Sequence, residues 1–456
     1  MANKSSDEKI SVIVGSGKTG LSCARFLQDR GLPFMVVDSR IDPPGMQQLV
    51  EEFPEVQLEL GGFRSSTFNN ARQLIVSPGV SLRETAIVEA RSRGVLVTGD
   101  IDLFSQYATA PVVAVTGSNG KSTVVSLVAE ILSAAGQKVG LGGNLDGANA
   151  RPALELLLRK QTRWDVFVLE LSSFQLETTS DLRAEVAVIL NLSEDHMDRY
   201  DDIDGYWQAK QRIFRGARKI VVNRDNPFSE PPDPGSAQIL RFGVGEAVDG
   251  EFGLSELNGT QHLCFGDTAV TRVDELKVAG RHNVANVLAA MTICHALGVD
   301  LKTIGAAVRE FRGLPNRCQW VTRVDDVNYY NDSKGTNVGA TVAAIDGVGQ
   351  AISGRVVLIA GGVGKSADFT PLRPVVERYV RLVIVIGAAA RELAETLKAQ
   401  TGIQFAGDMD EAVRLARKES LPGDAVLLSP ACASFDMFRD FNHRGQVFTE
   451  AVRSLQ

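Results

Sequence analysis

The sequence is poor in cysteine, and the cysteines that it has are scattered. No two of them form a C-x-x-C pair, and the five stand at Cys23, Cys264, Cys294, Cys318 and Cys432. An odd number without metal-ligand spacing argues against a disulfide framework and against a zinc site. We interpret each thiol as a small buried hydrophobe in a reducing compartment, and we expect the protein in the cytoplasm.

Long apolar runs and an excess of positive charge are absent too. No uninterrupted apolar stretch approaches the ~18 residues that a membrane span needs, and the N-terminal letters MANKSSDEKI lack the apolar region of a signal peptide. The formal net charge is -7 at pH 7, whereas nucleic-acid-binding surfaces are usually basic. We expect no membrane span and no nucleic-acid partner, although a local positive pocket on an acidic protein can still bind small anions.

The chain is long enough for several hydrophobic cores. Its 456 residues exceed what one core usually supports, and short Val- and Ile-rich runs such as FMVVD and RLVIVIG alternate with helical stretches. Unalternated runs of this length are typical of parallel strands that are buried on both faces. We predict an α/β protein with a Rossmann-like domain at 1–105, a P-loop ATPase-like domain at 106–313 with a small antiparallel part between about 238 and 278, and a second Rossmann-like domain at 314–456.

The first glycine motif indicates a nucleotide site. Gly15, Gly17 and Gly20 form G-x-G-x-x-G directly after a predicted strand. Asp38 ends the next strand, about 20 residues later, as in dinucleotide-binding motifs. The glycines would allow a tight turn and a close approach of phosphate to a helix N-terminus. The same pattern can also be a turn that merely packs a strand on a helix. On this motif alone, the expectation is an NAD enzyme.

A second phosphate-type loop argues against a dehydrogenase. The letters AVTGSNGKST, residues 114–123, follow a predicted strand and lead into a helix. Val115 stands where the P-loop pattern G-x-x-x-x-G-K-[ST] has its first glycine. In this context we predict that Lys121 contacts the β- and γ-phosphates of ATP and that Ser122 binds Mg²⁺. The letters GGVGKS at 361–366 follow another strand and also lack the full spacing.

Candidate metal ligands follow two later strands of the same predicted domain. Glu170 ends the run VFVLE. The run VAVILN is followed by Asp195, His196 and Asp198. Such oxygen and imidazole groups beside a phosphate loop can hold Mg²⁺, and phosphoryl transfer needs neutralising charge of this kind. Taken alone, His196 is interpreted as a structural hydrogen-bonding residue and Lys210 as a solvated lysine.

Five segments of the chain resemble the Mur ligase family. They are TGSNGKST, ELSSFQLE, EDHMDRY, NDSKGTNVGA and SPACASFDMF, and they extend over all three predicted domains. The shortened loop T-G-x-N-G-K-[ST] is itself a mark of Mur ligases and of folylpolyglutamate synthetases. The resemblance thus implies an intact loop of an ATP-dependent, amide-forming enzyme. The motifs are most similar to those of the family member that adds D-glutamate to UDP-N-acetylmuramoyl-L-alanine.

The resemblance assigns the first domain to the UDP-linked substrate instead of NAD. The positions that match the family's contacts to this substrate are Gly17, Lys18, Thr19, Asp38, Ser39, Arg40, Ser77, Gly79, Asn144 and His196. The positions that match the D-glutamate pocket are Thr336, Lys365, Ser434 and Phe441. A lysine in that pocket pairs with a carboxylate of the incoming amino acid.

The resemblance also implies an ATP site with two Mg²⁺ ions. The positions that match the family's ATP site are Gly117, Ser118, Asn119, Gly120, Lys121, Ser122, Thr123, Asn283, Asn286, Arg317 and Asp332. The matching metal ligands are Ser122 and Glu170 at the first site, and His196 and Lys210 at the second, where the family carries a carbamylated lysine. A carbamate forms when a neutral lysine amine captures CO₂. The implied catalytic residues are Lys121, His196, Lys210 and Arg317.

The implied reaction makes an amide in two steps. The L-alanyl carboxylate attacks the γ-phosphate of ATP and forms an acyl phosphate, and the amine of D-glutamate then displaces phosphate. The product would serve cytoplasmic peptidoglycan precursor synthesis, and we expect a monomer. Three alternatives stay open: an NAD dehydrogenase, another Mur-type or folylpolyglutamate-synthetase-like ligase, and a nucleotide-gated binding module that hydrolyses ATP without joining substrates.

Overall fold

The computed structural model describes residues 9–145, 151–159, 162–197, 199–278, 280–365 and 367–455. These residues form mixed α/β structure with three sheets, which confirms the predicted fold class. They group into two compact units: a first unit of Met1–Leu192, His196–Phe242 and Ala289–Thr303, and a second unit of Ser193–Asp195, Gly243–Leu288 and Ile304–Gln456. The domain boundaries near residues 105 and 313 stay predictions. Within the described ranges, no helix is long and apolar enough to cross a membrane.

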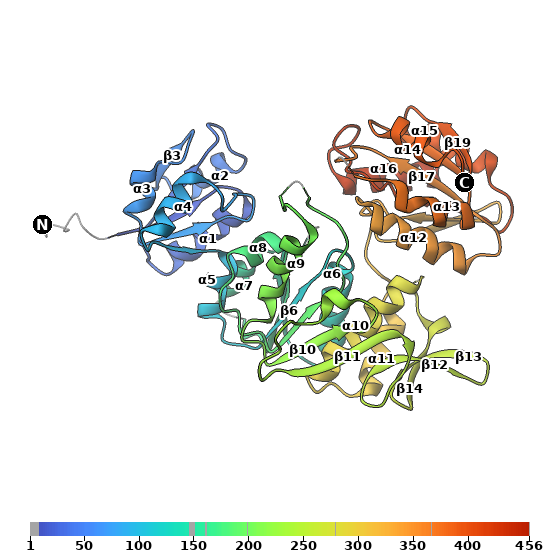
Figure 1. Cartoon of the computed structure of the whole chain (residues 1–456), viewed down its shortest axis with the longest axis horizontal. Coiled ribbons are helices and arrows are strands. Elements are labelled where there is room, and N and C mark those ends of the chain that lie inside the picture. Colours follow the sequence, from blue (N-terminus) through green and yellow to red (C-terminus); the bar gives the residue numbers. More distant parts are fainter. Residues whose placement is uncertain are drawn as a thin grey trace, which may run out of the picture. The chain divides into compact units, whose positions relative to one another are not determined.

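The first sheet is parallel and has five strands in the order β3-β2-β1-β4-β5. They are β1 (Ser11–Val14), β2 (Phe34–Asp38), β3 (Gln57–Leu60), β4 (Gln73–Val76) and β5 (Leu96–Thr98). The helices along this part of the chain, labelled in Figure 1, are α1 (Lys18–Asp29), α2 (Met46–Glu52), α3 (Ser65–Asn69), α4 (Thr85–Ser92) and α5 (Asp100–Tyr107). The strand order reverses between β1 and β4, so the loops after these two strands lie side by side.

The second sheet has nine strands in the order β14-β13-β12-β11-β10-β9-β6-β8-β7. Its parallel part contains β6 (Val112–Thr116), β7 (Val139–Gly143), β8 (Val166–Glu170), β9 (Val186–Ile189), β10 (Lys219–Asn223) and β11 (Gln238–Glu246). The helices along this stretch are α6 (Lys121–Ala134), α7 (Ala153–Leu157), α8 (Ser173–Glu177), α9 (Ile203–Gln211), α10 (Arg281–Ala296) and α11 (Leu301–Glu310). Because β6 pairs with β8 and β9, the segments after these three strands reach the same edge of the sheet.

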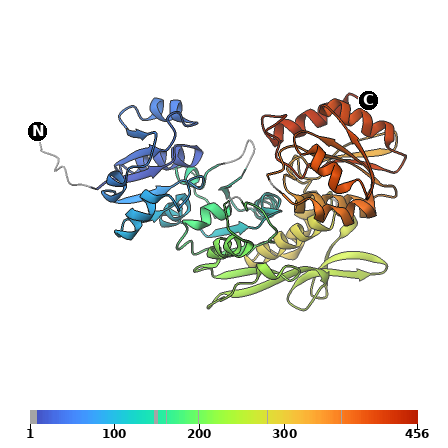
Figure 2. The same cartoon turned by 45° about the horizontal axis from the view of Figure 1, so that its top comes forward.

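The antiparallel strands of this sheet lie within the predicted region between about residues 238 and 278. They are β12 (Phe252–Leu257), β13 (Thr260–Phe265) and β14 (Thr268–Arg272), the yellow-green strands in Figure 2. The predicted start near residue 238 falls on β11, which neighbours β12 on one side and pairs in parallel with β10 on the other. The segment 224–237 between β10 and β11 is long enough for the crossover that a parallel pair requires.

The third sheet belongs to the second unit and has six strands in the order β15-β16-β20-β17-β18-β19. They are β15 (Gln319–Val324), β16 (Val327–Asn331), β17 (Val356–Gly361), β18 (Val380–Ile386), β19 (Gly402–Phe405) and β20 (Ala425–Leu428). The helices are α12 (Val338–Ala351), α13 (Arg373–Tyr379), α14 (Ala390–Leu397), α15 (Met409–Glu419) and α16 (Phe441–Arg453). β15 pairs antiparallel with β16, and the other pairs are parallel. Separate apolar clusters form from its alternating side chains, as expected for a sheet covered on both faces.

One apolar core runs through the first unit. It joins residues that pack on the first sheet, such as Phe26, to residues of the second sheet, such as Phe167. Phe104 on α5 belongs to the same core, and its ring meets the ring of Phe167 edge to face, with centroids 5.1 Å apart. The two sheets of the first unit are therefore connected through shared buried side chains.

Gly20 and Gly17 offer a matched test of how closely α1 packs on β1. A Cβ atom on Gly20 would lie 1.9 Å from the carbonyl oxygen of Gly15, whereas a Cβ on Gly17 would meet no atom within 4 Å. We predict that Gly20→Ala lowers the free energy of unfolding by about 1–3 kcal/mol, the usual cost of overpacking. Gly17→Ala, the control, should change it by less than about 0.5 kcal/mol. Chemical denaturation measures both values, and equal stabilities would contradict the prediction.

Candidate active site

The shortened glycine loop connects β6 to the N-terminus of α6. Gly117 has a φ of 152° and Gly120 a φ of 83°, which L side chains rarely adopt. A Cβ on Gly117 would also lie 3.1 Å from the Cβ of Leu190. Gly120 caps α6 without a side-chain hydrogen bond. A helix N-terminus of this kind, preceded by a glycine turn, is suited to bind phosphate through its backbone N–H groups.

Lys121 folds back over this loop. Its Nζ donates hydrogen bonds to the carbonyl oxygens of Gly117, at 2.8 Å, and Ser118, at 2.9 Å. The ammonium group therefore lies beside the loop backbone, at the first residue of α6. A phosphate bound at the helix N-terminus would lie within its reach, as the P-loop pattern predicts.

The residue that supports the loop is Asn191, which the sequence analysis does not identify. Its backbone oxygen accepts a hydrogen bond from the Ser118 N–H at 3.0 Å. Its side chain accepts from the Asn119 N–H at 2.9 Å and donates to the Asn119 carbonyl at 3.1 Å. Asn191 stands just after β9, the neighbour of β6. A polar residue at the end of a buried strand is the signal that could have identified it.

Glu170 lies at the carboxyl end of β8, on the other side of β6. It is 3% exposed. Its Oε2 accepts a 2.5 Å hydrogen bond from the hydroxyl of Ser122, and its Oε1 accepts from the Asn144 amide at 3.2 Å. The structure thus brings together two predicted metal ligands and one predicted substrate contact.

Lys210 is buried, so its interpretation as a solvated lysine is wrong. Its side chain reaches inward from α9, and its Nζ donates to the Gly117 carbonyl at 3.1 Å and to the Thr116 hydroxyl at 3.3 Å. It also lies 4.5 Å from the centre of the Tyr206 ring. Lys210 therefore reaches the glycine loop through tertiary packing that its sequence position alone does not reveal.

His196 has a φ of 59°, and the centre of its ring lies 4.8 Å from the centre of the Phe174 ring.

The described residues include no group of three or more His, Cys, Asp or Glu side chains that could hold a metal ion by themselves. The first predicted site does not need such a group, because Mg²⁺ usually keeps several waters and binds one or two carboxylates. The contact between Ser122 and Glu170 fits that pattern. At the second predicted site, the Lys210 amine acts as a hydrogen-bond donor and would become an oxygen ligand only as a carbamate. Asp198 lies outside the described residues.

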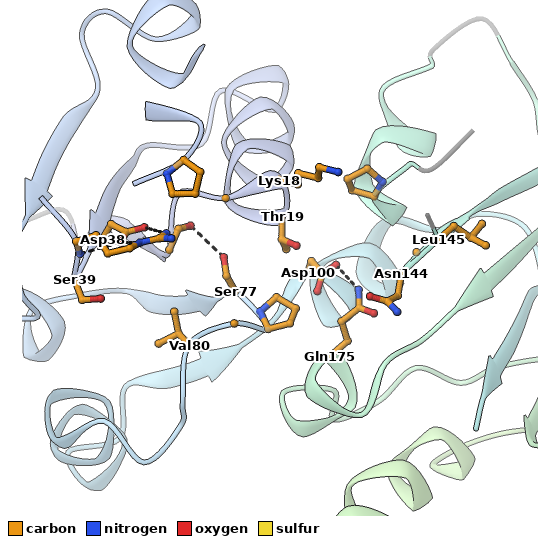
Figure 3. A pocket seen from close by; sticks show the side chains of 18 residues that line it. Lys18, Thr19, Asp38, Ser39, Ser77, Val80, Asp100, Asn144, Leu145 and Gln175 are labelled. Carbon is orange, nitrogen blue, oxygen red and sulfur yellow. Dashed lines mark hydrogen bonds and ion pairs between the residues drawn. The ribbon is translucent and has the colours of Figure 1, made fainter. Parts of the chain in front are cut away.

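A cavity of about 580 Å³ lies in the first unit where the loops after β1 and β4 meet (Figure 3). Ser77 donates a hydrogen bond to the Gly15 carbonyl at 3.1 Å across these loops. Most of the residues predicted to contact the UDP-linked substrate line the cavity, namely Gly17, Lys18, Thr19, Asp38, Ser39, Arg40, Ser77, Gly79 and Asn144. His196 does not line it. The volume is typical of small-molecule sites.

Asp38 organises one end of this cavity. Its Oδ2 accepts from the N–H and the hydroxyl of Ser16, both at 2.9 Å. Arg40 donates to both carboxylate oxygens at 2.8 Å. Burial alone would raise the pKa of Asp38, but the hydrogen bonds from Arg40 and Ser16 lower it overall. The carboxylate therefore stays ionised and fixes the guanidinium of Arg40 at the cavity wall.

Asp100 and Gln175 also line the cavity, and the sequence analysis does not identify them. The Gln175 amide donates to Oδ2 of Asp100 at 2.9 Å, as Figure 3 shows. Oδ1 of Asp100 is buried without a hydrogen bond of ordinary geometry. Burial raises the pKa of Asp100 to about 6, although the Gln175 hydrogen bond acts in the opposite direction. Asp100 lies outside the quoted motifs, and Gln175 lies within ELSSFQLE but receives no role there; the packing of α5 against α8 brings the two together.

A second group of candidate residues lies in the second unit, at the carboxyl ends of β16, β17 and β20. Asp332 follows β16 and accepts hydrogen bonds from the Ser429 hydroxyl at 2.8 Å and the Cys318 N–H at 3.0 Å. Burial raises the pKa of Asp332 to about 7, although these bonds and the charge of Arg317 oppose the shift. The strand order of the sheet reverses here, which is where open α/β sheets bind ligands.

Arg444 on α16 contributes a buried positive charge to this group, and the sequence analysis misses it. It is fully buried. It donates to the carbonyl oxygen of Ser333 at 2.8 Å, to the Ser333 hydroxyl at 3.0 Å and to the Cys432 carbonyl at 3.1 Å. A fourth bond reaches the Gly361 carbonyl at 3.4 Å. Burial lowers the pKa of Arg444 to about 10, so the side chain stays charged at neutral pH.

The residues predicted for D-glutamate lie on the same strand-end loops and on α16. Phe441 begins α16, and the ammonium of Lys334 lies 3.9 Å from the centre of its ring. Ser434 is buried in the segment after β20. Lys365 is exposed after β17 and has a φ of 51°. The Thr336 N–H donates to the Lys334 carbonyl at 2.7 Å.

The other predicted ATP contacts of the second unit lie on α10 and before β15. Asn283 and Asn286 are buried on α10, where the Asn286 amide donates to the Asn283 side-chain oxygen at 3.4 Å. Arg317 is half-buried, and its N–H donates to the Leu314 carbonyl at 3.3 Å. The roles of all three residues in binding ATP stay predictions.

Asp100→Asn tests the buried carboxyl group. Because its pKa is raised in the folded protein, the folded state holds the proton more tightly, and the stability that this group contributes falls as the pH rises from about 4 to about 6. An amide removes this dependence. We predict that the stability of the variant relative to the parent rises between pH 4 and pH 7 by up to about 3 kcal/mol. Thermal unfolding of both proteins across this range provides the measurement, and a pH-independent difference would refute the idea.

Three family models match consecutive parts of the chain. Residues 9–99 match the Mur ligase MurD-like N-terminal domain, and residues 115–294 match the Mur ligase middle domain. Residues 316–432 match the Mur ligase glutamate ligase domain. The glycine loop at 117–120 falls within the middle-domain match, and Asp332 falls within the glutamate ligase domain.

Similar proteins match the chain over nearly its full length. It is 49% identical over 450 residues to a UDP-N-acetylmuramoylalanine–D-glutamate ligase of Nitrosococcus oceani, which covers 98% of this chain and 96% of that protein. It is 48% identical over 444 residues to the Pseudomonas aeruginosa protein of the same name, over 97% and 98% of the two chains. The fold is similar to UDP-N-acetylmuramate-alanine ligase MurC of Thermotoga maritima, with a TM-score of 0.60 and 19% identity over 98% of this chain and 100% of that chain. These matches show that the chain belongs to the Mur ligase family.

Proposed function

We propose that the chain is an ATP-dependent ligase that joins D-glutamate to UDP-N-acetylmuramoyl-L-alanine in cytoplasmic peptidoglycan precursor synthesis. The observation that carries the proposal is the identity of nearly half of all residues, over almost the whole length, with proteins named for this activity. The matches to three successive Mur ligase domains support it. The site geometry is compatible with each part of the reaction.

ATP would bind at the glycine loop of the first unit. The backbone N–H groups at the start of α6 would hold its phosphates, and Lys121 would pair with the β- and γ-oxygens. The contacting pair of Ser122 and Glu170 would hold a divalent cation there. When bound, Mg²⁺ would neutralise charge on the transferring phosphoryl group.

Lys210 is proposed to complete a second metal site together with His196. Its amine lies against the Gly117 carbonyl, at the base of the phosphate loop. Addition of CO₂ to the neutral amine, with loss of one proton, would replace this hydrogen-bond donor by an anionic oxygen ligand. Burial of the side chain would shield such a carbamate from water.

The UDP-linked substrate would occupy the cavity of about 580 Å³ in the first unit. Asp38 fixes Arg40, and the two side chains would recognise the uridine end. The glycine turn after β1, with the N-terminus of α1, would accept the diphosphate. Asn144 lies between this cavity and Glu170, which it contacts, so it would meet the muramoyl end near the phosphate loop.

D-glutamate would bind in the second unit at the carboxyl ends of β16, β17 and β20. An amino acid with two carboxylates needs positive charge, and Lys365 and the buried Arg444 supply it in this group. Ser434 and Thr336 would add hydroxyl groups for hydrogen bonds to a carboxylate. Phe441 would cover the apolar part of the side chain.

The reaction forms an amide by activating the acid first. An oxygen of the L-alanyl carboxylate attacks the γ-phosphorus of ATP, ADP leaves, and an acyl phosphate forms. The nitrogen of D-glutamate then attacks the acyl carbon and loses a proton, and phosphate leaves. Lys121 and Arg317 would stabilise negative charge on the phosphoryl oxygens, which is the main contribution that proteins make to phosphoryl transfer.

Lys121→Ala tests the role of the glycine loop. We predict that the variant releases ADP at least about 100-fold more slowly than the parent under saturating substrates, because the charge beside the phosphates is lost. Lys138→Ala, which removes an exposed lysine just before β7, is the control and should keep normal turnover. A coupled assay of ADP release measures both. Normal turnover by Lys121→Ala would contradict the assignment.

A panel of amino acids tests the substrate assignment. With ATP, Mg²⁺ and UDP-N-acetylmuramoyl-L-alanine, we predict that phosphate release depends on D-glutamate and that L-glutamate, L-alanine and diamino acids give less than about a tenth of that rate. Mass spectrometry of the product should show one added glutamate residue. Phosphate release without an amino acid would instead indicate an ATPase that joins no substrates. Phosphate release that requires L-glutamate and a folate acceptor would indicate a folylpolyglutamate-synthetase-like ligase.

A further inference from the structure

A second cavity of the first unit is lined by arginine. It measures about 420 Å³ and lies between the segment after β4, α4 and the stretch from α8 to the residues after α9. Its charged lining residues are Arg83, Arg91, Arg199, Arg212, Arg215 and Glu177. Five arginines but a single acidic residue line it, although the whole chain carries a net negative charge. None of these residues is part of the site described above.

The carboxylates nearby satisfy only two of the five arginines. Arg199 pairs with Glu177 at 2.6 Å, and Tyr200 donates to the other oxygen of Glu177 at 2.7 Å. Arg83 pairs with Asp201 at 2.7 Å. The other three arginines, at positions 91, 212 and 215, form no ion pair with a carboxylate among the described residues.

Arg212 is destabilised by the other positive charges that line the cavity. It is half-buried, and its Nε donates to the Thr179 carbonyl at 3.0 Å, which holds the side chain in place. Burial lowers the pKa of Arg212, and the positive charges of Arg215 and Arg91 lower it further, while Asp102 and Glu177 oppose the shift only in part. A guanidinium stays charged under all ordinary conditions, so it cannot relieve this repulsion by losing its proton. An anion in the cavity would relieve it.

The same loop lines both cavities. Ser77 to Val80 line the cavity proposed for the UDP-linked substrate, and the next residues, Ser81 to Arg83, line the arginine cavity. Arg199 joins them, because its guanidinium donates to the Val80 carbonyl at 3.2 Å while it pairs with Glu177. An anion held by arginines from both sides would fix this loop more firmly.

We propose that the arginine cavity binds a small phosphorylated molecule with two anionic groups and that its binding raises the affinity of the neighbouring cavity for its ligand. Arg83 and Arg91 belong to the segment after β4 and to α4, whereas Arg212 and Arg215 follow α9. Two phosphates would bridge these sides through bidentate guanidinium contacts. Such coupling is reciprocal, so each ligand strengthens the binding of the other. The effect on turnover rests on the function proposed above, whereas the binding itself does not.

The shape of the site favours a small ligand over an acidic protein surface. A partner protein would meet arginines on a flat or convex face, whereas these arginines line a hollow. Arg83, Arg91 and Arg215 are exposed there, and Arg199 and Arg212 are half-buried. A volume of about 420 Å³ lies within the range of pockets for small molecules. If the parent chain does not bind the bisphosphate in the experiment below, the small-ligand proposal fails.

Isothermal titration of the full chain with fructose 1,6-bisphosphate, without nucleotide or metal, tests the binding. Fructose is the uncharged control ligand. The test variant is Arg91→Gln with Arg215→Gln, and the matched control is Arg93→Gln with Arg218→Gln, which removes the same charge from exposed positions outside the cavity. We expect the parent and the control to bind the bisphosphate and the test variant to bind it at least about tenfold more weakly. Equal binding by both variants, or no binding by the parent, overturns the proposal.

Steady-state kinetics test the coupling separately. Adding the bisphosphate should lower the KM for the UDP-linked substrate in the parent and in the control variant, with kcat unchanged, and should have no effect on the test variant. Matching thermal unfolding midpoints of the two variants show that the fold is intact. If the bisphosphate binds but KM does not change, the coupling is refuted. If the chain has no ligase activity at all, the titration still decides the anion site, so the two proposals fail independently.

Discussion

The hydrogen bonds between Asn191 and the glycine loop are the interaction on which the phosphate end of the site depends. The loop is shorter than a standard P-loop, so it has fewer residues with which to hold its own shape. Asn191 compensates with three hydrogen bonds, to Ser118 and to both backbone groups of Asn119. Because Asn191 follows β9, the strand next to β6, the pairing of two buried strands sets the path of the loop. The conformation of the glycine loop thus depends on the sheet as well as on the residues of the motif.

The three sheets place polar residues by the same physical rule. Parallel strands that are buried on both faces cannot carry polar side chains along their length, so these collect where the strands end. In the first sheet they gather between β1 and β4, in the second around β6, and in the third around β16, β17 and β20. Each location is a point where strand order reverses and two loops separate.

Local motifs made part of the site predictable from the sequence. The glycine loop and Ser122 could be predicted because a strand, a turn and a helix follow each other directly in the sequence, and Glu170 because it ends a later apolar run. Asp100 and Gln175 could not, because only the packing of α5 on α8 brings them together. The burial of Lys210 and the parallel pairing of β11 likewise depend on contacts between distant segments. The fold class needed less information, since repeated apolar runs already indicate parallel sheets.

Arg444 has a consequence for the second unit that goes beyond its charge. It hydrogen-bonds to Ser333, Gly361 and Cys432. Ser333 follows β16, Gly361 ends β17, and Cys432 follows β20. One planar group with five donors in a fixed geometry thus cross-links three separate chain segments. The electrostatic potential of this edge is consequently established during folding. A doubly charged amino acid would meet a field that is already in place and would need no rearrangement to create it.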